Sequence, residues 1–379
     1  MSADNLRHLR DLCDRSVEII RANQHDSGAY VACPSFPVYR YCWFRDGAFI
    51  ADAMSRIGEY ESAEAFFDWC SRVLVSRSSV IGSVIARARE GEEVADTELL
   101  PCRYRLDGDD DDEPWTNFQL DGYGTWLWAL SEHLRRSGRS TSSLWRSAAG
   151  LTVDYLSAFW SRPCYDWWEE HGDKRHVGTL GAIVGGLEAI AREDFVDDEH
   201  RRVAQTAAAA ARDEVLRLGV QDGHLCKWYG TNAVDASLLS CIIPFRLVEP
   251  EEPIAQATLA AVETDLVSVG VHRYLADTYY GGGEWLLLSA FLGWQQLAFG
   301  RADDAATQLS WIAAQAEPNG YLPEQVAGHL LAADREAEWI ASSGPVASPL
   351  LWSHAMFITL AAELGIVPES APDRPRFQA

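Results

Sequence analysis

Two adjacent carboxylates beside two indoles make Tyr165–Glu170, Tyr-Asp-Trp-Trp-Glu-Glu, the stretch of this sequence best suited to chemistry. Indole rings can stack on a sugar ring, and apolar surroundings raise the pKa of a carboxyl group until it can act as an acid near neutral pH. The same residues also suit a structural role, because tryptophan fills cores and glutamates favour the start of a helix. The hexamer alone leaves both interpretations open.

Similar clusters of aromatic and charged residues occur elsewhere in the chain, each shortly before an apolar segment. They are Tyr39–Asp46, Trp115–Asp121, Lys227–Asn232, Arg273–Trp285, and Leu322–Gln325 followed by Ser348–Trp352. Each has a structural explanation of its own: tryptophans as core, aspartates as helix caps and glycines as turns. Six clusters that all precede apolar segments favour a shared site.

Helical periodicity dominates the rest of the sequence. Twelve helices are expected, at 5–23, 46–57, 60–76, 121–137, 141–160, 176–192, 197–218, 234–243, 253–268, 283–299, 301–316 and 349–365. The odd-numbered ones carry many charges, as half-exposed helices do, whereas the even-numbered ones are apolar nearly all round and should be buried. Repeated pairs of one exposed and one buried helix predict an all-α fold, a toroid of six helical hairpins or (α/α)6 barrel. Its buried helices run parallel, so all six clusters should meet at one end.

Residues 79–120 lack this helical period. Ser-Val-Ile-Gly-Ser-Val-Ile at 79–85 and the segment 98–106 alternate as strands do, which predicts a short β-hairpin insertion around residues 79–105. The acidic run Asp107–Glu113 lacks the glycine and glutamate of a calcium loop, so we expect a solvated loop there. No linker rich in proline or serine divides the chain, and residues 1–379 are expected to form a single catalytic domain.

Composition narrows the class of partner. The 379 residues include 56 acidic and 32 basic ones, a net charge of −24 that opposes binding to nucleic acid or to an anionic membrane. The N-terminal residues do not read as a secretory signal, and the eight scattered cysteines favour reduced thiols in a cytoplasmic protein. No zinc-hydrolase, serine-hydrolase, dinucleotide or P-loop motif is present, so we expect no cofactor and no metal. A small neutral molecule is the expected partner.

Four motifs together resemble those of glycoside hydrolase family 15, which contains glucoamylases, glucodextranases and some trehalases. In order and spacing, they are Trp43–Asp46, Trp168–Glu170, Arg273–Trp285 and Pro323–Gln325. The resemblance covers residues 39–360 and implies an (α/α)6 barrel that hydrolyses α-glucosides from the non-reducing end with inversion. The implied substrate is a neutral oligosaccharide and the implied product is β-glucose.

The resemblance also implies roles for individual residues. Glu169 is expected to be the general acid that protonates the glycosidic oxygen, and Glu324 the general base that activates water. Inversion places two such carboxyl groups about 6.5–9.5 Å apart.

The remaining implied residues bind the substrate. Arg45 and Asp46 are expected to hold the terminal glucose, Arg273 is the second arginine at that subsite, and Glu170 lies beside the leaving sugar. The expected aromatic walls are Tyr39, which lies near the attacking water, and Trp43, Trp115, Trp167, Trp168 and Trp285.

The sequence leaves alternatives open both for the preferred glycosidic linkage and for the type of reaction. The chain is similar to small single-domain members of the family that act on isomaltose-like α-1,6 disaccharides, with maltose, malto-oligosaccharides or trehalose as the alternatives. A disaccharide phosphorylase, a sugar epimerase or a non-catalytic sugar binder could use the same scaffold. Glu324 in a Pro-Glu-Gln loop favours hydrolysis over phosphorolysis, and epimerases of this shape rely on histidines that these motifs lack.

Overall fold

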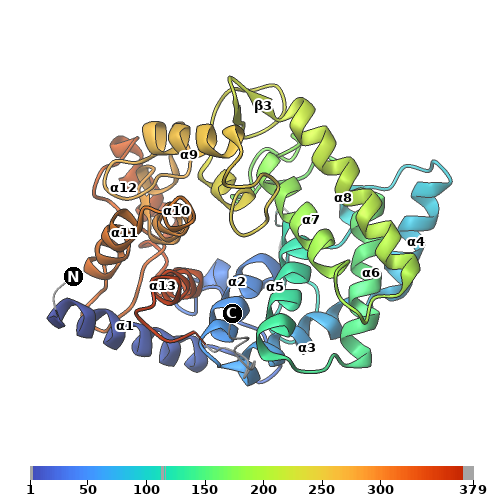
Figure 1. Cartoon of the computed structure of the whole chain (residues 1–379), viewed down its shortest axis with the longest axis horizontal. Helices are drawn as coiled ribbons and strands as arrows, with labels where there is room; N and C mark the ends of the chain where they lie inside the picture. The colour runs from blue at the N-terminus through green and yellow to red at the C-terminus, as the bar shows by residue number, and fades with distance from the viewer. Residues whose placement is uncertain (1–2, 112–114, 116, 370–379) are drawn as a thin grey trace, which may run out of the picture.

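Six inner helices form a closed ring at the centre of the protein. The computed structural model describes residues 3–111, 115 and 117–369. The inner elements are α2 (Phe44–Arg56), α5 (Asp121–Ser137), α7 (Val177–Ile190), the 3-10 helix η3 (Ala236–Cys241), α10 (Leu286–Ala298) and α13 (Leu351–Glu363). Each packs against the next, and α13 packs against α2, which closes the ring. Figure 1 shows these helices around the centre of the molecule.

An outer layer of six helices surrounds this ring. Its members are α1 (Ala3–Ala22), α3 (Tyr60–Ser76), α6 (Ser143–Phe159), α8 (Asp198–Leu218), α9 (Pro253–Leu266) and α11 (Ala302–Ala314). Each outer helix packs against at least one inner element, for example α8 against α7 and α11 against α10. Along the chain, outer and inner helices therefore alternate. The architecture is the predicted (α/α)6 barrel.

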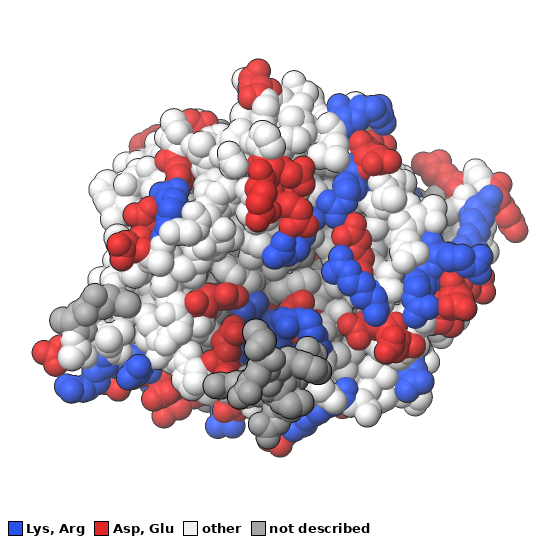
Figure 2. All heavy atoms as spheres, viewed as in Figure 1, with Lys and Arg blue, Asp and Glu red and all other residues white. Residues whose placement is uncertain are grey.

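Residue composition explains which helices are inside. Every residue of α7 except Glu188 is buried, as its Gly-Thr-Leu-Gly-Ala-Ile-Val-Gly-Gly-Leu sequence requires. Glycines let α5 and α7 approach closely, because a Cβ at Gly186 would lie 2.1 Å from the carbonyl oxygen of Gly124. The outer helix α8 instead begins at an Asp197 cap and buries mainly small alanines on one face. Its charged side chains, of both signs, lie interspersed on the right of Figure 2.

The predicted β-hairpin insertion around residues 79–105 is wrong. Residues Ser78–Arg89 form a helix, α4, that packs against α6. Its buried residues are Ile81, Val84 and Ile85, which follow the i, i+3, i+4 spacing of a helix; Val80, which completed the apparent alternation, is exposed. The β-branched residues suggested strands, but packing against α6 outweighs that preference.

Two further elements differ from the prediction. The helix expected at 234–243 is the shorter η3, because Pro244 has no N–H to donate and disfavours helical geometry in the residue before it. The helix α12 (Ala333–Ser343) was not predicted. The other expected helices are confirmed, with shifts of a few residues at their ends.

Short elements connect the layers. The 3-10 helices are η1 (Pro37–Tyr39), η2 (Asp96–Glu98) and η4 (Tyr279–Gly281). Three antiparallel pairs of two-residue strands join β1 (Cys42–Trp43) to β2 (Arg103–Tyr104), β3 (Val220–Gln221) to β4 (His224–Leu225), and β5 (Glu284–Trp285) to β6 (Gln325–Val326). β1 and β5 lead directly into the inner helices α2 and α10, so these pairs hold the chain at the entrances of two buried helices.

Ion pairs with arginines hold the acidic loop after residue 106, and the cysteines form no disulfides among the described residues. Arginines pair with the carboxylates of Asp107, Asp109, Asp110 and Asp111, and the remainder of the predicted acidic run, 112–113, lies outside the described residues. All eight cysteines are buried with free thiols. Among the described residues, no helix combines the length and apolar character needed to cross a membrane.

Candidate active site

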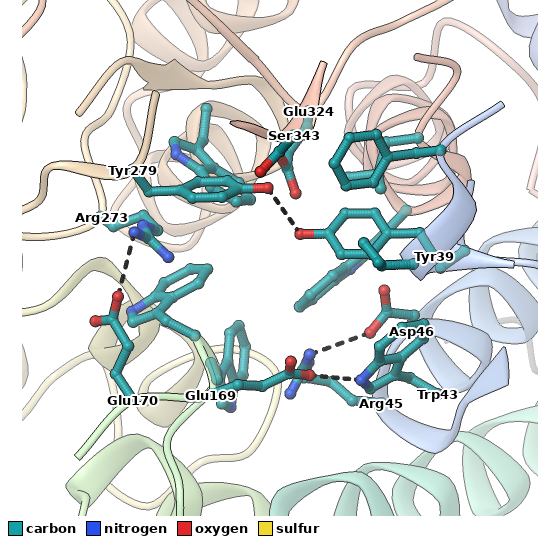
Figure 3. Close-up of a pocket in the computed structure, with 18 of the residues that line it drawn as sticks. Tyr39, Trp43, Arg45, Asp46, Glu169, Glu170, Arg273, Tyr279, Glu324 and Ser343 are labelled. Carbon is teal, nitrogen blue, oxygen red and sulfur yellow. Dashed lines mark hydrogen bonds and ion pairs between the residues drawn. The ribbon is translucent and has the colours of Figure 1, made fainter. Parts of the chain in front are cut away.

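A cavity of about 720 Å³ lies at the end of the barrel where the segments before the inner helices meet. The segments before α2, α5, α7, α10 and α13 contribute side chains to it, shown in Figure 3. All twelve predicted site residues line this cavity: Tyr39, Trp43, Arg45, Asp46, Trp115, Trp167, Trp168, Glu169, Glu170, Arg273, Trp285 and Glu324. The expectation that six clusters converge needs one correction. Lys227–Asn232 contributes no described lining residue; its Lys227 pairs instead with Asp235, the carboxylate that accepts from the Trp168 indole.

Glu169 lies in a tight turn that its neighbours enforce. Its own φ is +62°, a left-handed conformation that costs energy for a residue with a side chain. The carboxylate of Asp166 supports the turn by accepting hydrogen bonds from the backbone N–H groups of Trp168 and Glu170. Backbone bonds from Glu169 to Asp166 and from Asp166 to Glu170 close it. The turn aims the Glu169 side chain into the cavity (Figure 3).

Two indoles bind the Glu169 carboxyl group. Trp43 Nε1 donates to Oε1 at 2.5 Å, and Trp115 Nε1 donates to Oε2 at 2.7 Å. Burial raises the pKa of Glu169 to about 7, although Arg45 and the two indole N–H groups lower it. A carboxyl group in this state can be protonated near neutral pH and still act as an acid.

Arg103 holds those two indoles in place, a role that sequence reasoning missed. Its guanidinium lies 3.8 Å from the ring centre of Trp115 and 5.3 Å from that of Trp43. β2 carries Arg103 opposite Trp43 in β1, and the side chain is fully buried with an ion pair to Asp111. The signal in the sequence was the segment 98–106, which was assigned to an insertion and not connected with the site.

Glu324 lies across the cavity from Glu169 (Figure 3). Its backbone N–H donates to Ala347, and its carbonyl oxygen accepts from Leu286 at the start of α10, so the residue is fixed between two inner-helix entrances. Burial raises the pKa of Glu324 to about 8, while Arg273 and the hydroxyls of Tyr39 and Tyr279 lower it. Oε2 has no hydrogen-bond partner among the described residues, which leaves a buried acceptor at the cavity wall.

Arg45 and Asp46 form a polar corner at the start of α2. Arg45 Nη1 donates to Gln119 at 2.9 Å and to Asp121 at 3.1 Å, and Arg45 Nη2 pairs with Asp46 at 3.3 Å. Burial raises the pKa of Asp46 to about 6, although Arg45 opposes it. The corner presents a cation that can donate hydrogen bonds beside a carboxyl group that can accept them.

A second arginine lies on the opposite wall. Arg273 makes a bidentate pair with Asp277, at 2.7 and 2.5 Å, and lies 3.6 Å from the carboxylate of Glu170. Glu170 also accepts a hydrogen bond from the hydroxyl of Tyr274. The guanidinium is surrounded by the rings of Trp168, Tyr274, Tyr279 and Trp285. This wall combines charge with flat apolar surface.

Further lining residues were not among those predicted. Tyr279 donates to or accepts from Tyr39, with their hydroxyl oxygens 3.1 Å apart. Trp339 and Ser343 reach the cavity from α12, although no residue of that helix is buried, so α12 lies at the rim. Tyr279 stands inside a motif already quoted, whereas Trp339 belongs to the helix that was missed. Within the described ranges, no group of three or more metal-ligating side chains occurs.

The chain is similar to known proteins in both sequence and structure. The model of the family described as Glycosyl hydrolases family 15 matches residues 10–298. An "Isomaltose glucohydrolase" of Kribbella flavida is 47% identical over 376 residues, covering 98% of this chain and 97% of that protein. The structure of a glycosidase variant in complex with glucose is 46% identical with a TM-score of 0.95, covering 97% of this chain and all of that one.

A bacterial glucoamylase in complex with acarbose is similar in fold, with a TM-score of 0.74 at 20% identity over 96% of this chain and 56% of that one. The family match extends over most of the barrel, and the 47% identical relative extends it to nearly the whole length. The chain belongs to glycosyl hydrolases family 15 and is a glycoside hydrolase.

Proposed function

We propose that this enzyme is an inverting, exo-acting α-glucosidase that releases β-glucose from the non-reducing end of short α-1,6-linked glucosides, isomaltose first among them. The observation that carries the proposal is a pair of carboxyl groups with raised pKa values, the half-buried Glu169 and the buried Glu324, on opposite sides of one aromatic cavity. Two such groups across a sugar-sized space are what inversion requires.

In the proposed reaction, Glu169 gives its proton to the glycosidic oxygen as the bond from that oxygen to C1 breaks. A water molecule on the other face of the ring forms a new bond to C1 and loses a proton to Glu324. The leaving sugar departs with the proton from Glu169, and the remaining sugar is β-glucose. The partnerless Oε2 of Glu324 is the acceptor available to that water.

The reaction needs Glu169 protonated and Glu324 ionised at the same time. With pKa values of about 7 and about 8, the two groups can hold one proton between them near neutral pH. The cation of Arg273 and the hydroxyls of Tyr39 and Tyr279 stabilise negative charge on Glu324. They favour the ionised form of Glu324, but its pKa is the higher of the two, so the reactive form, with the proton on Glu169, is the minor one of the two singly protonated forms.

Position in the cavity suggests which sugar each wall binds. Arg45 and Asp46 are suited to the hydroxyls of the terminal glucose, and the tryptophans to its flat faces. Arg273 would be the second arginine that holds the terminal glucose, and Glu170 would face the leaving sugar. The preference for isomaltose rests on the relative of that name, which is 47% identical over nearly the full length of both proteins. Buried free thiols support the further proposal of a reducing, cytoplasmic setting.

Glucose release from isomaltose, maltose, trehalose, kojibiose and longer isomalto-oligosaccharides tests the substrate. We expect the highest kcat/KM for isomaltose and β-glucose as the first anomer detected by NMR. Glu169→Gln and Glu324→Gln should each lower kcat by about 10²- to 10⁴-fold with little change in KM. Glu61→Gln, on the exposed face of α3, is the matched control.

Three outcomes would contradict the proposal. Initial α-glucose would exclude inversion, and a dependence of turnover on phosphate would favour a phosphorylase. Full activity in both glutamine variants would remove the catalytic assignment. A preference for maltose or trehalose would overturn the linkage while leaving the reaction type in place.

A further inference from the structure

A buried cluster of charged residues lies directly behind the turn that carries Glu169. At its centre is Lys227, which is 4% exposed. The chain has only two lysines, and the side chain of the other, Lys174, is 40% exposed and pairs with Asp173. The small cavity that described residues line beside Lys227 leaves no space for a water molecule. The ammonium group therefore depends on neighbouring side chains for its stabilisation.

Three groups surround that ammonium. Nζ of Lys227 lies 2.7 Å from Oδ2 of Asp235 and 3.5 Å from Oδ2 of Asp166. It also lies 3.3 Å from the centre of the Tyr274 ring, a close cation–π contact. A compact ammonium fits between two carboxylates and a ring face, whereas a planar guanidinium is larger. This geometry explains a lysine here in a chain whose basic residues are nearly all arginines.

Through Asp166, Lys227 supports the backbone of the acid turn. One oxygen of Asp166 accepts from the N–H groups of Trp168 and Glu170, at 3.0 and 2.9 Å, and the other faces Lys227. These two N–H groups flank Glu169, whose own φ is +62°. The negative charge of Asp166 strengthens both bonds, because a charged acceptor binds an N–H group more tightly than a neutral one.

The other two contacts of Lys227, with Asp235 and Tyr274, connect it to Trp168 and Glu170, the residues on either side of Glu169. Asp235 accepts from the indole N–H of Trp168, at 2.9 and 3.1 Å. The Tyr274 ring lies against the ammonium, and its hydroxyl donates to Glu170. One buried cation thus contacts the partners of Trp168 and of Glu170 as well as the support of the turn itself.

Electrostatics makes this arrangement depend on the positive charge. Burial alone would raise the pKa of Asp235, but Lys227, together with hydrogen bonds from Ser237, holds that pKa below its ordinary value. Without the ammonium, Asp166 and Asp235 would be two like charges that repel each other in one buried site. An Asp166 carboxylate displaced by that repulsion would hold the turn more weakly.

We propose that Lys227 is the positioning residue for the general acid: it keeps the Trp168–Glu170 turn in the geometry from which Glu169 delivers its proton. The inference rests on the proposed function, since it assumes that Glu169 protonates the leaving group. Lys227 lines no part of the cavity among its described lining residues, and it acts through Asp166, Asp235 and Tyr274.

A pair of substrates with different leaving groups tests this role. Isomaltose needs a proton on its departing oxygen, whereas α-glucosyl fluoride loses fluoride with little need of an acid. Lys227→Met should lower kcat for isomaltose by about 50-fold, as a small misplacement of a catalytic group does, and lower kcat for the fluoride by no more than about fivefold. The inhibition constant of glucose should change by less than about twofold, because Arg45 and Asp46 are untouched.

Matched variants separate positioning from general damage. Lys174→Met makes the same substitution at the other lysine and should leave both substrates unaffected. Lys227→Arg keeps the charge and should recover part of the isomaltose activity. If Lys227→Met does not fold, as judged by circular dichroism and thermal unfolding, then Lys227→Gln replaces it, since it is neutral yet can still donate to Asp235.

The outcomes are distinct. Equal losses for the two substrates in the folded Lys227 variant would show a structural role only and overturn the inference. Glu169→Gln serves as the reference, and it should lose isomaltose activity far more than fluoride activity. If Glu169→Gln loses both equally, the assignment of the acid fails. If Glu169→Gln is selective and Lys227→Met is not, only the role of Lys227 fails.

Discussion

Replacing Glu324 with glutamine should make the protein more stable at alkaline pH, although it removes the proposed base. Glutamine has almost the same shape but does not ionise. The wild-type carboxyl group is 3% exposed, and burial raises its pKa from 4.5 to about 8. Folding therefore makes ionisation of Glu324 costly, and the glutamine variant avoids this cost.

The magnitude follows from proton linkage. Because the folded pKa is raised, the folded protein binds this proton more tightly than the unfolded chain does. The stabilising effect is complete below the unfolded pKa of 4.5 and is lost as the pH rises through about 8. The folded and unfolded pKa values differ by about 3.5, which at 1.36 kcal/mol for each pKa unit amounts to about 5 kcal/mol. The variant should gain this much relative to wild type between acidic and alkaline pH.

Urea unfolding of both proteins, followed by tryptophan fluorescence from about pH 4 to about pH 9, measures this difference. The relevant quantity is the free energy of unfolding of Glu324→Gln minus that of wild type, since effects of all other groups cancel in it. Glu61→Gln, an exposed substitution, should show no such trend. A difference that stays constant with pH would show that the pKa of Glu324 is not raised, and the electrostatic basis of the site would fail.

Three other predictions concern the site and the barrel. The kcat/KM for isomaltose should rise as Glu324 ionises and fall as Glu169 loses its proton, giving a bell with limbs near 7 and 8; with α-glucosyl fluoride, which needs little acid, the alkaline fall should be absent. Trp339→Ala removes a ring that packs against Tyr279 at the cavity rim, and it should raise KM for isomaltose about 2- to 10-fold without a matching fall in kcat. Gly186→Ala should lower the free energy of unfolding by at least about 1–3 kcal/mol, because its Cβ would lie 2.1 Å from the Gly124 carbonyl oxygen; unchanged urea midpoints would refute that packing argument.

Local patterns carried most of the fold prediction. The alternation of charged and apolar helices depends on residues three and four apart, so it is visible in the sequence and identifies the inner and outer layers. The secondary-structure prediction failed where the local preference of the residues differs from the structure that tertiary packing favours. Val80 and Ile81 read as a strand, yet Ile81 packs in the helix α4. α12 escaped notice because it is short and none of its residues is buried.

The sequence motifs predicted which residues line the cavity, but not how those residues contact one another. Trp43 and Glu169 were both proposed for the cavity, yet nothing local indicates that one donates a 2.5 Å hydrogen bond to the other across 126 positions. Arg103 was missed for the same reason, since its role comes from pairing with Trp43 in a two-residue ladder. Lys227 was noticed only as part of a loop cluster.

By itself, the sequence determined the helical layers, because periodicity is a property of neighbouring residues, and its motifs indicated two candidate carboxylates through their resemblance to a known family. Only the tertiary structure decided what those carboxylates can do. Their raised pKa values arise from burial by segments that lie far apart in the chain, and Arg45 and Arg273, which fold in beside them, limit the rise. Desolvation depends on what surrounds a group in space, and that is settled when the ring of helices closes.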